Sequence, residues 1–121
     1  MTEARINLPF PPSVNGLYAN MHNVGRVKTE PYKDWLNEAG WALKIQRVAH
    51  FNGPVTISYT FGKKKGRYDL SNFLKPIDDL LVAHAVIADD NSKIITGFTV
   101  TQDPELEGVL VHVSALESEA A

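Results

Sequence analysis

Hydrophobic side chains recur along the chain with two different spacings. Every second residue is apolar over residues 55–61 and 6–10, which predicts two strands with one buried face each. Prolines within and after the earlier run end that strand. Residues 93–101 and 109–113 predict two more strands, and the turn-rich segment at 103–105 joins them as a hairpin.

Two other segments have the spacing of amphipathic helices. An apolar stripe with a proline in its first turn predicts a helix over residues 31–50, with Asn-Gly-Pro at 52–54 as the stop. A shorter stripe predicts a second helix over residues 71–84. Pro76 fits this helix only if the regular turns begin close to Lys75.

The order of these segments indicates the fold class. Residues 13–27 are polar with no sustained period, and we interpret them as a long loop. The remaining order (β-α-β-α-β-β) predicts an α+β fold, a mixed four-stranded sheet with two helices on one face. We expect one domain over residues 1–121, with residues 114–121 frayed. The other sheet face is then solvated or covered by a second subunit.

Composition excludes several classes of protein. The 121 residues include no cysteine, which excludes a disulfide framework and thiolate zinc sites. The N-terminal residues have no apolar signal core, and the longest near-apolar run, residues 80–88, is too short to cross a bilayer. We therefore expect a cytoplasmic protein with no membrane partner.

The formal net charge of −2 conceals two oppositely charged halves. Residues 1–67 carry ten Lys/Arg and four Asp/Glu, whereas residues 68–121 carry two Lys/Arg and ten Asp/Glu. Such a division is compatible with phosphate contacts in one half and metal ligands in the other.

A basic run lies where the two halves meet. Lys63, Lys64, Lys65 and Arg67 place four cations within five residues. A solvated loop would explain the run, and so would a clamp for a polyanion such as DNA.

Polar residues continue directly after the basic run. Asp69, Ser71 and Asn72 stand at the start of the second predicted helix, where helix capping is their common role. Lys75 and Asp79 are four residues apart on the same helical face as Asn72. A surface ion pair would explain the Lys75–Asp79 spacing, but it would not require the neighbouring polar residues.

Asp89 and Asp90 close this stretch, with Asn91 and Ser92 behind them. An acidic turn is one interpretation. The other is that the chain folds back and brings the pair close to Asp69, forming a site of hard oxygen ligands suited to Mg²⁺ or Mn²⁺. Together with a nearby lysine and a basic clamp, such a site favours metal-assisted phosphodiester hydrolysis, with Lys75 stabilising the transition state.

These residues resemble the RusA-type Holliday junction resolvases, also called crossover junction endodeoxyribonucleases. The resemblance extends over about residues 6–100. Its motifs are the strand and Pro-rich segment ending at Asn15, the basic run, Asp69-Leu70-Ser71-Asn72, Lys75 with Asp79, and Asp89-Asp90.

The resemblance implies a RusA-like fold and a homodimer that resolves four-way DNA by paired symmetric nicks in recombination and repair. The implied cofactor is Mg²⁺, which Mn²⁺ can replace, and the implied host is a bacterium or a phage-infected cell. Asp69 and Asp90 match the metal-binding acids, Asp89 is adjacent, and Lys75 matches the essential lysine. We expect the DNA contacts to come from the following residues: Lys63, Lys64, Lys65, Arg67, Asn72 and Asn15.

Two positions depart from the family's pattern. Ser71 stands where the best-known motif has an aspartate, which removes one carboxylate from the metal site. Asp79 or the Ser71 hydroxyl could supply the missing ligand. Tyr68 stands where an arginine often precedes the first aspartate, and Arg67 could serve instead.

Three other functions stay open. The chain could bind junctions without cutting them, act on other branched DNA, or be a protein-interaction module whose charges are only solvated.

Overall fold

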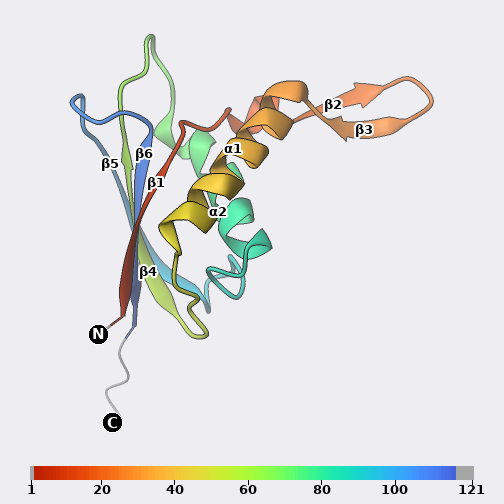
Figure 1. Ribbon diagram of the computed structural model, residues 1–121. Coiled ribbons are helices and arrows are strands. Elements are labelled where there is room, and N and C mark those ends of the chain that lie inside the picture. The colour runs from red at the N-terminus through yellow and green to blue at the C-terminus, as the bar shows by residue number, and fades with distance from the viewer. Residues whose placement is uncertain (1, 117–121) are drawn as a thin grey trace.

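The computed structural model describes residues 2–116, which form an α+β fold with a four-stranded mixed sheet and two α-helices (Figure 1). Two short 3₁₀ turns (η) and a separate two-stranded sheet complete it. The elements in chain order are β1 (Glu3–Leu8), η1 (Val14–Gly16), β2 (Tyr18–Met21), β3 (Gly25–Lys28), α1 (Glu30–Gln46), β4 (Val55–Phe61), η2 (Leu70–Phe73), α2 (Leu74–Ala83), β5 (Ile95–Gln102) and β6 (Val109–Ala115).

The four-stranded sheet has the order β1-β6-β4-β5. β4 pairs with β6 in antiparallel and with β5 in parallel orientation, so the predicted hairpin of the last two strands is wrong. β4 has the most regular burial of alternate residues, and the central position gives it a neighbour on each side. The 103–108 connection crosses the end of β4, where the Asp103 N–H donates to the Phe61 carbonyl at 2.9 Å.

Both α-helices lie on the same face of this sheet (Figure 1). Alternate residues of β4 and β6 point toward the helices and are buried, while Thr56, Ser58 and Thr60 point to the opposite face. There the Thr99 hydroxyl donates to Ser58 Oγ at 3.0 Å, and no helix covers the hydroxyl-bearing side within residues 2–116. The main core side chains are Val55, Ile57, Tyr59, Phe61, Val109, Val111, Val113, Trp35, Leu43, Ile77 and Leu81.

The helices differ from the predicted ranges at their ends. α1 stops at Gln46 because Arg47 adopts a left-handed conformation (φ 53°) and its N–H returns to the Leu43 and Lys44 carbonyls. The predicted extension to residue 50 is therefore wrong. α2 begins at Leu74, so Pro76 lies in its first turn as the sequence requires, and residues 70–73 form η2 instead of regular helix.

The segment predicted as a long loop contains η1 and a β-hairpin instead. Tyr18 pairs with Lys28 and Met21 with Gly25, and the hairpin extends away from the body of the molecule (Figure 1). All of β2 is exposed, so its residues lack the apolar alternation that identifies a half-buried strand. The predicted element order is therefore incomplete.

The C-terminal strand is longer than predicted. β6 reaches Ala115, whose N–H donates to the Thr2 carbonyl at 2.9 Å, so fraying is wrong for residues 114 and 115. Residues 117–121 of the predicted frayed tail lie outside the described residues. Neither α-helix in residues 2–116 has the length and apolarity needed to cross a membrane.

Candidate functional site

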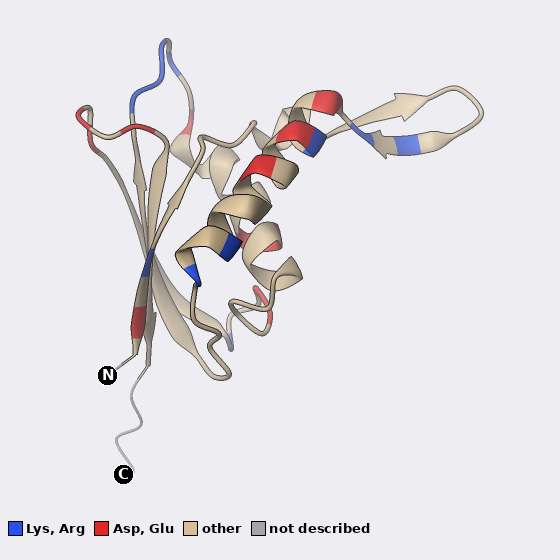
Figure 2. Ribbon diagram, in the orientation of Figure 1, with Lys and Arg blue, Asp and Glu red and all other residues tan. Residues whose placement is uncertain are grey.

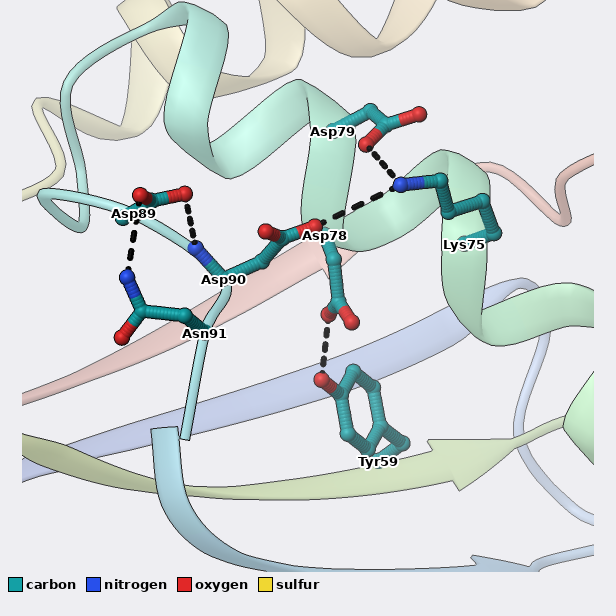
Figure 3. A network of polar contacts seen from close by, with 7 residues as sticks. All are labelled: Tyr59, Lys75, Asp78, Asp79, Asp89, Asp90 and Asn91. Carbon is teal, nitrogen blue, oxygen red and sulfur yellow. Dashed lines mark hydrogen bonds and ion pairs between the residues drawn. The ribbon is translucent and has the colours of Figure 1, made fainter. Parts of the chain in front are cut away.

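Lys75 lies between two carboxylates at the start of α2. Its Nζ is 3.1 Å from Asp79 Oδ1, one turn further along the helix, and 3.5 Å from Asp90 Oδ2, in the turn before β5 (Figure 3). The fold therefore brings Asp90 to the predicted lysine across fifteen residues of sequence. The i,i+4 ion pair expected from the sequence is present, and it is one half of a three-residue cluster.

The carboxylates stabilise the charged form of Lys75. The hydrogen bond that Lys75 donates to Asp79 and the negative charge of Asp79, with a smaller contribution from Asp90, raise the pKa of Lys75 above its ordinary value. The side chain is half exposed. Lys75 is thus an ammonium at neutral pH, which suits it to stabilise negative charge and not to accept a proton.

Asp78 lies beneath this cluster and was missed by the sequence interpretation. The Tyr59 hydroxyl of β4 donates a short hydrogen bond to Asp78 Oδ1 (Figure 3). Burial raises the pKa of Asp78 to about 6, the Tyr59 hydrogen bond opposes that rise, and the negative charge of Asp90 adds to it. Burial and Asp78 likewise raise the pKa of Tyr59. The sequence spacing could have identified Asp78 as a sheet-facing residue, because it is four residues after the apolar Leu74 and so lies on the same side of α2.

Asp89 organises the turn that carries Asp90. Its Oδ1 accepts the Asp90 N–H at 2.7 Å, and its Oδ2 accepts Asn91 Nδ2 at 3.0 Å (Figure 3). Asn91 Oδ1 in turn accepts the Lys93 N–H at 2.9 Å. Both carboxylate oxygens of Asp89 are therefore used locally, as the acidic-turn interpretation predicts.

Asp69 lies in a different environment, at the residue before η2. Its backbone is extended and its carboxylate makes no capping hydrogen bond, although its carbonyl accepts the Asn72 N–H at 3.0 Å. Asp69 and Asn72 line a cleft of about 510 Å³ together with Lys64 and Arg67. The structure thus brings together two predicted metal or DNA residues and two cations of the basic run.

The basic run forms the loop that follows β4, seen as the largely blue loop at the top of Figure 2. Lys64 Nζ is 5.4 Å from the Phe10 ring centroid, 5.9 Å from that of Tyr68 and 5.8 Å from that of Phe73. These rings hold Lys64 against the body of the protein. Lys63 and Lys65 line a neighbouring hollow with Lys64, beside the 103–108 connection.

The remaining predicted residues lie near the start of α2. Ser71 is exposed on η2, and Asn15 is exposed on η1, which packs against both η2 and α2. Arg26 and Tyr18 of the β2–β3 hairpin also border this region, and the sequence interpretation missed them because it treated residues 13–27 as a loop.

The donor chemistry of the region fits Mg²⁺, because the available ligands are carboxylate and hydroxyl oxygens. Among residues 2–116, no group of three or more Asp, Glu, His or Cys side chains is close enough to hold a metal ion by itself. Mg²⁺ needs fewer protein ligands than such a group supplies, because it is usually held by one or two carboxylates together with phosphate oxygens of the substrate. The carboxylates that could meet this requirement are Asp90, which lies against Lys75, and Asp69, which lines the cleft with Lys64 and Arg67.

Neither a protein-family model nor a curated protein sequence matches this chain.

Proposed function

We propose that this chain is a metal-dependent endonuclease of the RusA-like type that cuts four-way or branched DNA. The observation that carries the proposal is the position of Lys75 between Asp79 and Asp90, with η2 separating it in the chain from the basic loop at residues 63–67. A fixed cation among carboxylates, together with loop cations that have no acidic partner within residues 2–116, suits cleavage of a phosphodiester.

In this proposal Lys75 acts on the reacting phosphate. Its ammonium is held charged by Asp79 and Asp90, so it can stabilise the additional negative charge of the transition state. Its exposed head leaves room for a phosphate to approach. Lys64 and Arg67 bind the flanking phosphates from the cleft that contains Asp69.

Asp90 and Asp69 would hold Mg²⁺, with Asp79 or the Ser71 hydroxyl as a further ligand and Mn²⁺ as a substitute. When bound, such an ion supplies an activated water and neutralises charge on the phosphate. Asp89 contributes indirectly, because it fixes the turn that presents Asp90.

Paired nicks on a junction of near two-fold symmetry require two sites, and we propose a homodimer. The uncovered sheet face with Thr56, Ser58 and Thr60, and the open edge strand β5, are the surfaces that could meet a second copy. A monomer at micromolar concentration in light scattering would contradict this part of the proposal.

One observation favours a second candidate, a junction-binding module without catalysis. Ser71 supplies no carboxylate, and Lys75 already forms ion pairs with Asp79 and Asp90, which would otherwise be available to a metal ion. Salt-sensitive junction binding with no cleavage in Mg²⁺ or Mn²⁺ would support this function instead.

The decisive test is cleavage of a synthetic four-way junction by the full chain with and without Mg²⁺. We expect two symmetric nicks from the parent, and a loss of at least about 10³-fold in rate for Asp69→Asn and Asp90→Asn, since each removes a metal ligand. Junction affinity measured in EDTA should stay within about threefold of the parent for both variants.

Asp34→Asn on the solvent-exposed side of α1 is the matched control and should cut like the parent. Flap and linear duplex substrates run in parallel separate a junction enzyme from one acting on other branched DNA. If Asp69→Asn and Asp90→Asn both cut at the parental rate, the metal-site assignment is wrong.

A further inference from the structure

The β2–β3 hairpin is fixed at its base and exposed along its length. Thr29, the residue before α1, donates its hydroxyl to the Gly16 carbonyl at 2.6 Å and its N–H to the Leu17 carbonyl at 3.0 Å. Leu17 is buried, and the Tyr18 ring packs edge-on against Tyr32 of α1 at 5.8 Å. These contacts set the direction in which the hairpin leaves the protein.

The two faces of the hairpin differ in chemistry. Because paired residues share a face of a β-ribbon, Tyr18 and Lys28 lie on the same side as Asn20 and Arg26. The Arg26 guanidinium stacks over the Tyr18 ring at 4.3 Å. Residues 17–29 include no Asp or Glu, so this face is positively charged without an acid of its own.

The cationic face reaches the candidate active site. Tyr18 and Arg26 line a cleft of about 450 Å³ whose other wall includes Lys75 and Asp79. Asp79 is paired with Lys75 at 3.1 Å, so Arg26 adds positive charge to a cleft in which the acid is already neutralised. An aromatic ring beside a guanidinium is an arrangement that proteins use to bind the backbone and bases of nucleic-acid strands.

We propose that the hairpin face formed by Tyr18, Asn20, Arg26 and Lys28 is a nucleic-acid-binding surface that continues the cleft of Lys75. Arg26 contacts a backbone phosphate next to the reacting one, and Lys28 contacts a phosphate further along the same strand. The inference rests on the proposed function in taking DNA as the ligand. It adds a second point of contact to the basic loop, which lies at the end of β4 and away from the hairpin (Figure 2).

The test is fluorescence anisotropy with a labelled four-way junction, in EDTA, over a series of salt concentrations. Arg26→Gln should raise the Kd about five- to tenfold and reduce the slope of log Kd against log salt by about 1, because one phosphate contact is lost. Lys28→Gln should act in the same direction. Lys44→Gln, in the last turn of α1 and at the end of that helix remote from the hairpin, is the matched control and should match the parent in both quantities.

Thermal unfolding of each variant shows whether the change is local, and we expect unaltered unfolding because the hairpin side chains are exposed. Parental affinity and salt slope in both Arg26→Gln and Lys28→Gln, or no DNA binding by the parent, would overturn the inference. The binding assay contains EDTA and is therefore independent of cleavage. A chain that binds through Arg26 in this assay but does not cut the junction in Mg²⁺ would contradict the proposed nuclease activity alone.

Discussion

The carboxylates around Lys75 and the cations of the loop at residues 63–67 lie on either side of η2, and they differ in how their charges are compensated. Lys75 is paired with both Asp79 and Asp90 within 3.5 Å, on a helix and a hydrogen-bonded turn, which leaves one net negative charge. In the described chain the loop cations have no acidic side chain within ion-pair distance, and only Lys64 is held by aromatic rings.

This difference indicates a division of labour. Groups that must be accurately placed for chemistry are best held by the protein itself, on rigid elements. Cations left without partners are available to a phosphate backbone, whose binding depends on charge more than on exact position. Substitutions around Lys75 should therefore change the cleavage rate, whereas substitutions in the basic loop should change the affinity for DNA and its salt dependence.

The largest effect is expected at the compensated cluster. Lys75→Met should lower the cleavage rate at saturating DNA by about 10²- to 10³-fold, because a charge aimed at the transition state is lost. The Mg²⁺ concentration for half-maximal activity should fall or stay equal, since the lysine no longer opposes a cation beside Asp79 and Asp90. A titration of the residual nicking rate with Mg²⁺ measures both quantities.

Lys33→Met, which removes the other lysine paired with a nearby acid on a helix, is the control and should leave both values unaltered. A Lys75→Met enzyme with the parental rate would remove Lys75 from the catalytic machinery.

A smaller effect of a different kind is expected in the basic loop. The double change Lys63→Gln and Lys65→Gln should weaken junction binding about tenfold and lower the salt slope by about 2, with the rate at saturating DNA retained. The double variant Lys33→Gln and Lys44→Gln is the control, because it removes two positive charges from α1 instead of from the loop. Equal losses in the two pairs would mean that the loop acts only through net charge.

The smallest effect is expected beneath the cluster, at Asp78. Its pKa is raised from 3.8 to about 6 by burial, so the folded state binds the proton more tightly than the unfolded state. The associated stability is present below about pH 4 and is lost as the pH rises through about 6. Asp78→Asn removes this dependence, and the variant should gain on the order of 1 kcal/mol relative to the parent between pH 4 and 7.5.

Urea unfolding at the two pH values, in EDTA, measures this difference, and Asp34→Asn is the control. An Asp78→Asn protein whose stability follows the parental pH profile would show that Asp78 titrates normally in the folded state.

The sequence predicted the parts of this fold that have one buried face. The alternation in residues 55–61 and the stripe of α1 are each repeated often enough to indicate a strand and a helix. It did not predict the hairpin at residues 18–28, because an exposed ribbon has no buried face. It also paired β5 with β6, since chain order favours adjacent pairing and only the packing of β4 places it between them.

The candidate site shows the same division between local and long-range information. The spacing of Lys75 and Asp79 determines their ion pair, since residues four apart on a helix are neighbours. Asp90 is brought to Lys75 only by the return of the chain after α2, and Tyr59 is brought to Asp78 only by the packing of α2 on β4. Arg26 lines the cleft of Lys75 and Asp79 only because of the direction in which the hairpin leaves the protein.

By itself, the sequence determined the types of charge that this protein carries, their order along the chain and the elements with a regular apolar period, because these depend on neighbouring residues. The tertiary structure decided which charges compensate one another and which stay open to a partner. That outcome depends on contacts between segments far apart in the chain, and no local pattern records those contacts.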